Sequence, residues 1–231
     1  MLLFPAVSTP AGQKIPERLE YSLSWTGIPV GTASQEIVDD GDVRRILSSA
    51  RSNAWLSTFY PVDNRTESIL EKSGDFPGRS RNFRMQFKEG SRVRDREISF
   101  NRAGKRARYF DRMIGEKLSI PIEADTFDIY SSFYHVRYLP LEPGRSIFLN
   151  VLDGRELRRV EVRVLRRERI KVPAGSFNTI VIEPMVKSEG VFEGKRGAYI
   201  WLTDDSRRIP VKAQTLVRVG SVTAVLTGGI Y

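Results

Sequence analysis

Strict alternation of apolar and polar residues is the feature that most constrains how this chain can fold. In the first such run, polar residues separate the apolar residues Leu19, Tyr21, Leu23 and Trp25. A period of two places all the apolar side chains on one face of a β-strand. The run therefore predicts a strand with one face buried and the other in solvent.

Similar runs recur along the chain, with Gly, Pro, Asn and Asp at the turns between them. After residues 19–25, strands are expected at 32–38, 44–52, 65–71, 83–88, 93–100, 106–110, 147–152, 157–170, 179–185, 198–203, 211–217 and 221–226. Many strands separated by closely spaced turns are typical of sandwiches and barrels. The expected fold is all-β and mainly antiparallel: a curved sheet, a half-barrel or a barrel-like sandwich with one or two short helices.

Two segments do not alternate and are expected to be these helices. Residues 54–61 predict a short helix or turn, with Asn53 as its N-cap and Pro61 as its end. Residues 127–138 predict a longer helix, capped by Asp125 or Thr126. Its aromatic residues Phe127, Tyr130, Tyr134 and Tyr138 fall at helical spacing. We expect this aromatic helix to cover the concave face of the sheet.

No linker or shift of composition divides the 231 residues. We therefore expect one β-rich domain over residues 17–231. Residues 1–16 begin with an apolar, small-residue segment that lacks a basic start, and predict a disordered tail or a signal-peptide remnant. No run of 18 apolar residues is present, so no transmembrane helix is expected.

The residues needed for common enzyme chemistry are scarce. The chain has no cysteine and one histidine, His135, which has no motif around it. Asp204 and Asp205 are adjacent, so on a strand their carboxylates would point to opposite faces. The acidic residues at 39–42 lack the spacing of a calcium loop and fit a hairpin turn. We expect no enzyme activity, no cofactor and no metal site.

The formal net charge is +9, which favours anionic partners. The basic residues are densest between 79 and 108, and a candidate patch for an anionic partner consists of Arg84, Arg92, Arg94 and Arg96. Nucleic acid is a less favoured partner because the interleaved Phe83, Phe87 and Phe100 resemble core residues, not an exposed stacking surface. A solvated basic face remains the alternative.

Aromatic residues suggest a second kind of site, an apolar cavity inside the curved sheet. The candidate ligand-binding residues are Trp25, Trp55, Phe59, Tyr130, Tyr134 and Trp201. The candidate ligands are a lipid or an anionic glycolipid. Ordinary core packing is the alternative explanation for these side chains.

Four segments carry a resemblance to a known family: YSLSWTGIPVG at 21–31, RYLPLEPG at 137–144, VPAGSFNT at 172–179 and IWLTDDSRRIPV at 200–211. Together they resemble the bacterial family known as domain of unknown function 3108. The resemblance implies an antiparallel β fold and export to the periplasm or envelope of a Gram-negative cell. The family has no established activity, so it supplies no site residues.

Two functions are therefore expected, both non-enzymatic and both in the cell envelope. In the first, the protein binds or carries a lipid-like or anionic amphiphilic ligand. In the second, it is a structural or interaction scaffold that docks an envelope protein or an anionic polymer.

Overall fold

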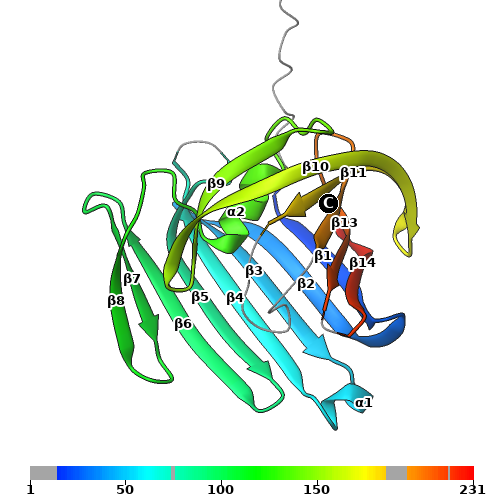
Figure 1. The fold of residues 1–231 in the computed structure, drawn as a ribbon, viewed down its shortest axis with the longest axis horizontal. Helices are drawn as coiled ribbons and strands as arrows, with labels where there is room; N and C mark the ends of the chain where they lie inside the picture. The colour runs from blue at the N-terminus through cyan, green and yellow to red at the C-terminus, as the bar shows by residue number, and fades with distance from the viewer. Residues whose placement is uncertain (1–14, 74–75, 186–196, 218) are drawn as a thin grey trace, which may run out of the picture.

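A computed structural model of the chain describes residues 15–73, 76–185, 197–217 and 219–231. The segment expected to be a tail or signal remnant, residues 1–16, lies outside the described residues except for its last two. The described residues form one antiparallel sheet of fourteen strands and two short helices, which confirms the all-β prediction (Figure 1).

The sheet consists of two arms, each a simple up-and-down array. The first arm contains β1 (Glu17–Trp25), β2 (Ile28–Asp40), β3 (Val43–Ser52), β4 (Val62–Glu71), β5 (Arg79–Glu89), β6 (Arg92–Asn101), β7 (Arg106–Asp111) and β8 (Glu116–Pro121). The second contains β9 (Ser146–Asp153), β10 (Glu156–Val172), β11 (Gly175–Pro184), β12 (Ala198–Thr203), β13 (Pro210–Leu216) and β14 (Ser221–Ile230). Of these strands, β8 was not predicted.

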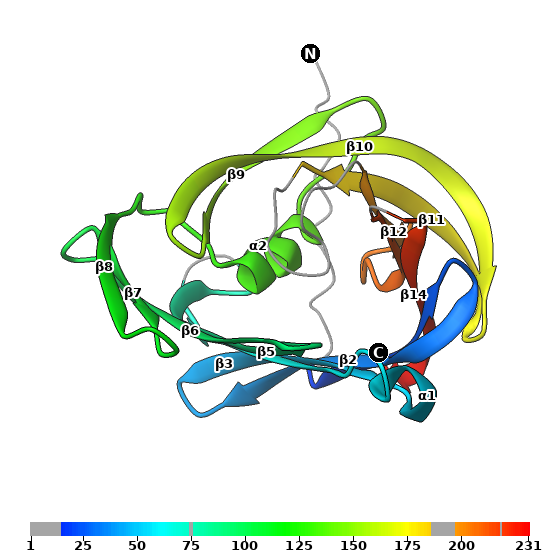
Figure 2. The ribbon, with the colours of Figure 1, turned by 60° about the horizontal axis from the view of Figure 1, so that its bottom comes forward.

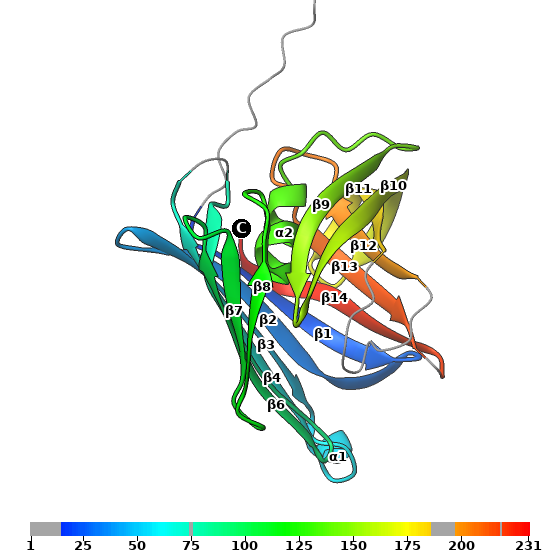
Figure 3. The ribbon, with the colours of Figure 1, turned by 60° about the vertical axis from the view of Figure 1, so that its left-hand side comes forward.

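The two arms are joined in the middle of the sheet, where β1 pairs with β14. In the rest of the sheet, each strand pairs with the next strand in the chain. The exception is β8 and β9, which are consecutive but unpaired and form the two outer edges. Figure 3 shows the arms as two walls that meet at β1 and β14. The walls face each other across the second helix, α2 (Ile129–Val136), as Figure 2 shows. The helix therefore occupies the concave side of the sheet, as expected.

Side chains rather than a hydrogen-bond ladder connect the two outer edges. Leu152 and Leu157 of the second arm pack in one cluster with Tyr109 and Ile120 of the first. Arg155, in the β9–β10 turn, forms an ion pair with Glu116 of β8 at 2.7 Å. The sheet is thus a barrel-like enclosure whose seam is closed by packing.

The helices differ slightly from the sequence prediction. The first helix, α1 (Ala54–Ser57), has Asn53 as its N-cap, as predicted. The cap of α2 is Asp128, not Asp125 or Thr126, so that prediction is wrong. The reason is tertiary: the backbone of Phe127 is bonded to Asn150 and Leu152 of β9, which holds it outside the helix.

Candidate ligand-binding lumen

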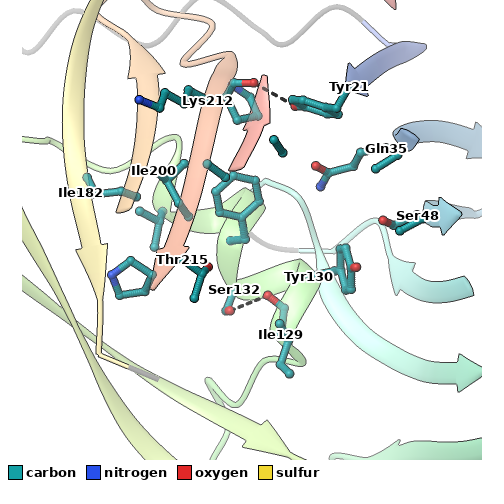
Figure 4. A pocket seen from close by; sticks show the side chains of 18 of the residues that line it. Tyr21, Gln35, Ser48, Ile129, Tyr130, Ser132, Ile182, Ile200, Lys212 and Thr215 are labelled. Carbon is teal, nitrogen blue, oxygen red and sulfur yellow. Dashed lines mark hydrogen bonds between the residues drawn. The ribbon is translucent and has the colours of Figure 1, made fainter. Parts of the chain in front are cut away.

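A cavity of about 420 Å³ lies between α2 and the inner face of the sheet (Figure 4). The helix contributes Ile129, Phe133 and Val136, whose spacing places them on one face. The opposite walls are mostly apolar because strand alternation turns the apolar residues inward; they include Leu23, Val160, Val162, Ile182 and Ile200. The cavity is thus an apolar space enclosed by both arms.

A second cavity of about 390 Å³ continues from the first towards β5–β7. Its apolar wall is formed by Phe83, Met85, Phe87, Ile98 and Tyr109. The two cavities share the lining residues Ser48, Ala50, Ile129, Tyr130, Ile200 and Thr215. We call the combined space the lumen, and Tyr130 lies where its two parts meet.

Small side chains on the inner face leave the lumen open. The inward positions of β2, β3 and β12–β14 carry Ala33, Ser48, Ala50, Ala198, Ala213, Thr215 and Ala224. Large residues at these positions would fill the space between the walls. The sequence analysis looked for large aromatic residues and missed this signal, which is the repetition of small residues at inward positions of neighbouring strands.

The polar residues that line the lumen include Gln35, Ser48, Lys212 and Thr215, and some polar groups of the wall are bonded to the protein. The hydroxyls of Tyr21 and Ser132 donate to the carbonyls of Pro210 and Ile129. An exception is Thr66, which is only 6% exposed and whose Oγ1 has no hydrogen-bond partner among the described residues. A buried hydroxyl without a partner is costly. Thr66 therefore leaves one hydroxyl, unpaired in the described structure, buried in the lumen wall beside its register partners Ser48 and Met85.

A charged pair stands beside the second cavity. Arg96 lines it and donates from Nε to Asp111 Oδ2 at 3.0 Å. Burial acts to raise the pKa of the Asp111 carboxyl, but the hydrogen bonds from Arg96, the Met113 amide and Tyr109, together with the charge of Arg96, outweigh it and the pKa is lowered. Asp111 therefore stays ionised and holds the guanidinium in place.

A buried ion pair closes the end of the barrel where β1 begins. Arg137, the C-cap of α2, donates from Nη1 and Nη2 to the two carboxylate oxygens of Glu17 at 2.8 and 2.7 Å. It also donates to the carbonyls of Arg207 and Arg208. Burial acts to lower the pKa of Arg137, but the hydrogen bonds and the charge of Glu17, together with Tyr134 and Tyr138, outweigh it and raise the pKa. The pair fixes α2 to both arms at once.

The structure separates the six aromatic residues expected to bind a ligand. Tyr130 lines the lumen. Tyr134 is fully buried among Ile37, Ile46 and Leu70, and its hydroxyl donates to Glu17. Burial raises the pKa of Tyr134 well above its ordinary value, so the hydroxyl stays protonated.

Trp201 packs in a separate core cluster, with Val172 and Val181 of the β10–β11 hairpin. Its indole donates to Glu168, and Lys212 Nζ lies 4.3 Å from the ring centre. The other three residues, Trp25, Trp55 and Phe59, are exposed at the far end of the barrel.

The four arginines of the candidate anionic patch lie on two faces of the sheet. Arg84 is paired in register with Glu97, and Arg96 with Met85 of the lumen wall. On the outer face, Arg84 forms an ion pair with Asp95 at 3.0 Å. Arg94 is two residues from Arg96 and so lies on the same face of β6. Arg92 is exposed at the β5–β6 turn. They therefore do not form one surface.

The residues considered for catalysis have structural contacts. The His135 ring stacks on Phe127 and its Nδ1 lies 3.2 Å from the carbonyl of Phe76. Asp204 bonds Arg167 and Arg208, and Asp205 bonds Arg207. Within the described ranges, no group of three acidic or histidine side chains is placed to hold a metal ion.

Comparison with known proteins identifies the family. The model of the family described as "Protein of unknown function (DUF3108)" matches residues 20–227. The chain belongs to the DUF3108 family. A search of curated proteins finds no match to this DUF3108 chain. No helix in the described part of the chain is long and apolar enough to span a membrane.

A solved structure supports the fold of this DUF3108 chain. It is a "Beta-barrel-like Protein of Domain of Unknown Function DUF1849" from Brucella abortus, with a TM-score of 0.59 and 11% identity. The match covers 95% of this chain and 99% of that one. A DUF1089 family protein from Pseudomonas aeruginosa is 13% identical, with 91% and 94% coverage, but its TM-score of 0.38 is too low to carry a structural argument. At this identity the first likeness concerns the fold alone.

Proposed function

We propose that this protein is a non-enzymatic binding protein of the cell envelope that holds the apolar part of a lipid-like ligand in its lumen. The observation that carries the proposal is the lumen itself, two connected cavities of about 420 and 390 Å³ with apolar walls. Each is within the usual size range of ligand pockets. The location in the envelope rests on the family resemblance.

Burial of an alkyl chain supplies enough energy for such binding. Each methylene group removed from water contributes about 0.8 kcal/mol, so ten contribute about 8 kcal/mol. That is the scale of a micromolar dissociation constant, before the cost of immobilising the ligand. The guanidinium of Arg96, held by Asp111, would orient a polar group within the same space.

A filled lumen tests the proposal. Ala50 is shared by both cavities, and the Ala50→Phe variant places a ring where they join. The matched control is Ala103→Phe, the same change in the exposed β6–β7 turn. Binding of the fluorescent fatty acid cis-parinaric acid is measured by titration. We expect saturable binding by the wild type and the control, and at least a tenfold loss in Ala50→Phe, because the ring displaces several methylene groups.

Two results would refute the proposal. One is the absence of saturable binding by the wild type, combined with native mass spectrometry that finds no lipid copurifying from the host. The other is equal binding by Ala50→Phe and the control, which would place the probe outside the lumen.

The scaffold function has less support from the outer face of the sheet. Several of its arginines are matched by carboxylates, as in the pairs of Arg45 with Glu67 and Arg84 with Asp95. Such pairing reduces the charge that these side chains offer to an anionic polymer.

A further inference from the structure

Large exposed apolar residues gather at one end of the barrel. Of the fourteen exposed ones in the described residues, eight lie at or beside the turns of the neighbouring strands β13, β14 and β1–β6, at the end where β1 finishes: Trp25, Ile28, Trp55, Phe59, Tyr60, Val93, Leu216 and Val219. These eight residues define what we call the aromatic end. It is formed by the β1–β2, β5–β6 and β13–β14 turns and by the connection containing α1, at the bottom of Figure 1.

Hydrogen bonds hold the aromatic end in a fixed shape. Trp25 Nε1 donates to the carbonyl of Val219 at 2.9 Å, and Trp55 Nε1 donates to that of Pro29 at 3.0 Å. The Tyr60 ring lies against Gly90, where an added Cβ would come within 2.7 Å of it. The polar atoms of both indoles are thus satisfied by the protein, which leaves their apolar surface exposed.

Basic residues accompany these side chains. The described turn segments 25–31, 51–63, 87–94, 216–217 and 219–222 contain four basic residues and two acidic ones, Asp63 and Glu89. Glu89 is buried and accepts a hydrogen bond from Asn64. Arg94 Nη1 is shielded from solvent and has no partner among the described residues. The aromatic end therefore carries a net positive charge.

The aromatic end also surrounds one end of the lumen. Leu23 lines the lumen, and Trp25 is the next residue on the same face of β1. Likewise Phe87 lines the lumen and is paired in register with Arg94. Glu17, which closes the opposite end with Arg137, lies at the other end of the nine-residue β1, roughly 25 Å away.

We propose that the aromatic end docks on the surface of an anionic lipid bilayer, with the lumen facing the membrane. Tryptophan and tyrosine are favoured at the membrane interface because their rings are apolar on one side and polar on the other. Lysine and arginine near the surface are attracted by anionic headgroups. A second copy of the chain is a poorer partner, because a symmetric contact would bring two positively charged surfaces together.

Vesicle flotation tests the proposal on the full chain. The vesicles are phosphatidylcholine alone or phosphatidylcholine mixed with phosphatidylglycerol. We expect binding to the anionic vesicles, weakened by salt, and weaker binding to the neutral ones. The Trp55→Ser/Phe59→Ser variant should bind at least tenfold more weakly, because each large ring contributes roughly a factor of ten when buried. The control is Phe148→Ser, an exposed aromatic residue of β9 away from this end.

Tryptophan fluorescence gives the orientation. Lipids brominated on their acyl chains quench tryptophans that enter the interface. We expect quenching of Trp25 and Trp55, while Trp201, which is 5% exposed, keeps its emission. Comparison of the wild type with Trp55→Phe and Trp201→Phe assigns the quenched signal. Quenching of Trp201 instead, or equal flotation of Trp55→Ser/Phe59→Ser and the wild type, would overturn the proposal.

Failure of docking can be separated from failure of the lumen. The Ala50→Phe variant should float with anionic vesicles like the wild type even when it no longer binds cis-parinaric acid. Analytical ultracentrifugation completes the test. Membrane docking would be overturned if the wild type is a dimer that does not float with vesicles and if the Trp55→Ser/Phe59→Ser change dissociates that dimer. This result would assign the aromatic end to contact with a second copy.

Discussion

The buried pair of Glu17 and Arg137 allows a quantitative test of how α2 is held in the barrel. The Arg137→Met variant keeps most of the apolar stem and removes the guanidinium. It leaves the Glu17 carboxylate, whose side chain is 2% exposed, with the Tyr134 hydroxyl as its remaining hydrogen-bond partner in the described structure. Removing one partner of a buried ion pair costs about 3–5 kcal/mol, because the other charge is left without compensation.

This cost can be measured as a loss in the free energy of unfolding and in Tm. For a chain of this length, 1 kcal/mol corresponds to about 2–4 °C, so Tm should fall by about 6–20 °C. Urea denaturation followed by circular dichroism gives the free energy directly. The control is Arg145→Met, which breaks an ion pair with Glu142 whose side chains are 77% and 58% exposed. That exposed pair should contribute less than about 1 kcal/mol.

A double variant separates the charge effect from the other bonds of Arg137. Glu17→Met/Arg137→Met removes both charges, so its cost should be less than the sum of the single costs. It should not be zero, because the carbonyls of Arg207 and Arg208 and the hydroxyl of Tyr134 lose their bonds to the pair. If Arg137→Met costs no more than the Arg145→Met control, the pair does not anchor the helix and the reasoning is refuted.

Three further predictions concern local features. Asp128→Ala removes the N-cap of α2, which accepts hydrogen bonds from the amides of Tyr130 and Ser131 and from the Ser68 hydroxyl. Urea denaturation should show that the free energy of unfolding falls by about 2–4 kcal/mol, and by less for Asp128→Asn. The hydrogen bond from Arg84 lowers the pKa of Asp95. The stability that this ionised carboxylate contributes is therefore present above the ordinary carboxyl pKa of about 3.9 and is lost as the pH falls through the lower folded-state pKa. Asp95→Asn should flatten this part of the curve of unfolding free energy against pH, and an unchanged curve would contradict the prediction. Gly31→Ala places a Cβ 2.0 Å from the Arg51 carbonyl and should cost about 1–3 kcal/mol, whereas Gly228→Ala, with open space around it, should be nearly neutral in the same assay.

Local patterns predicted most of the fold. The alternation in β1 and β5 identified which residues face inward, and Asn53 was identified as a cap from its position before a short helix. The start of α2 was wrong because Phe127 is bonded to β9, a strand that follows the helix in the chain. The sequence of residues 125–138 could not predict that contact, because the strand that makes it lies outside this segment.

The site was harder to predict than the fold. The lumen depends on small residues such as Ala33, Ala50 and Ala213, which become significant only when neighbouring strands are placed in register. Conspicuous residues such as Trp55 and Phe59 lie outside it. The separation of Arg84 from Arg96 could have been predicted, because Arg96 shares its parity in the strand with Ile98, a core residue.

The joint between β1 and β14 has a consequence for how the protein folds. Thr227 of β14 bonds the carbonyl of Glu20 in β1 across a sequence separation of 207 residues. Each hairpin of either arm can form from nearby residues, but this joint requires closing a very long loop and is expected to form late. Until then β1 and β14 each present an unpaired edge, a recognised starting point for aggregation. The two walls of the lumen would thus come together in one of the slowest folding steps. The lumen can form only if β1 and β14 are protected from aggregation until that step.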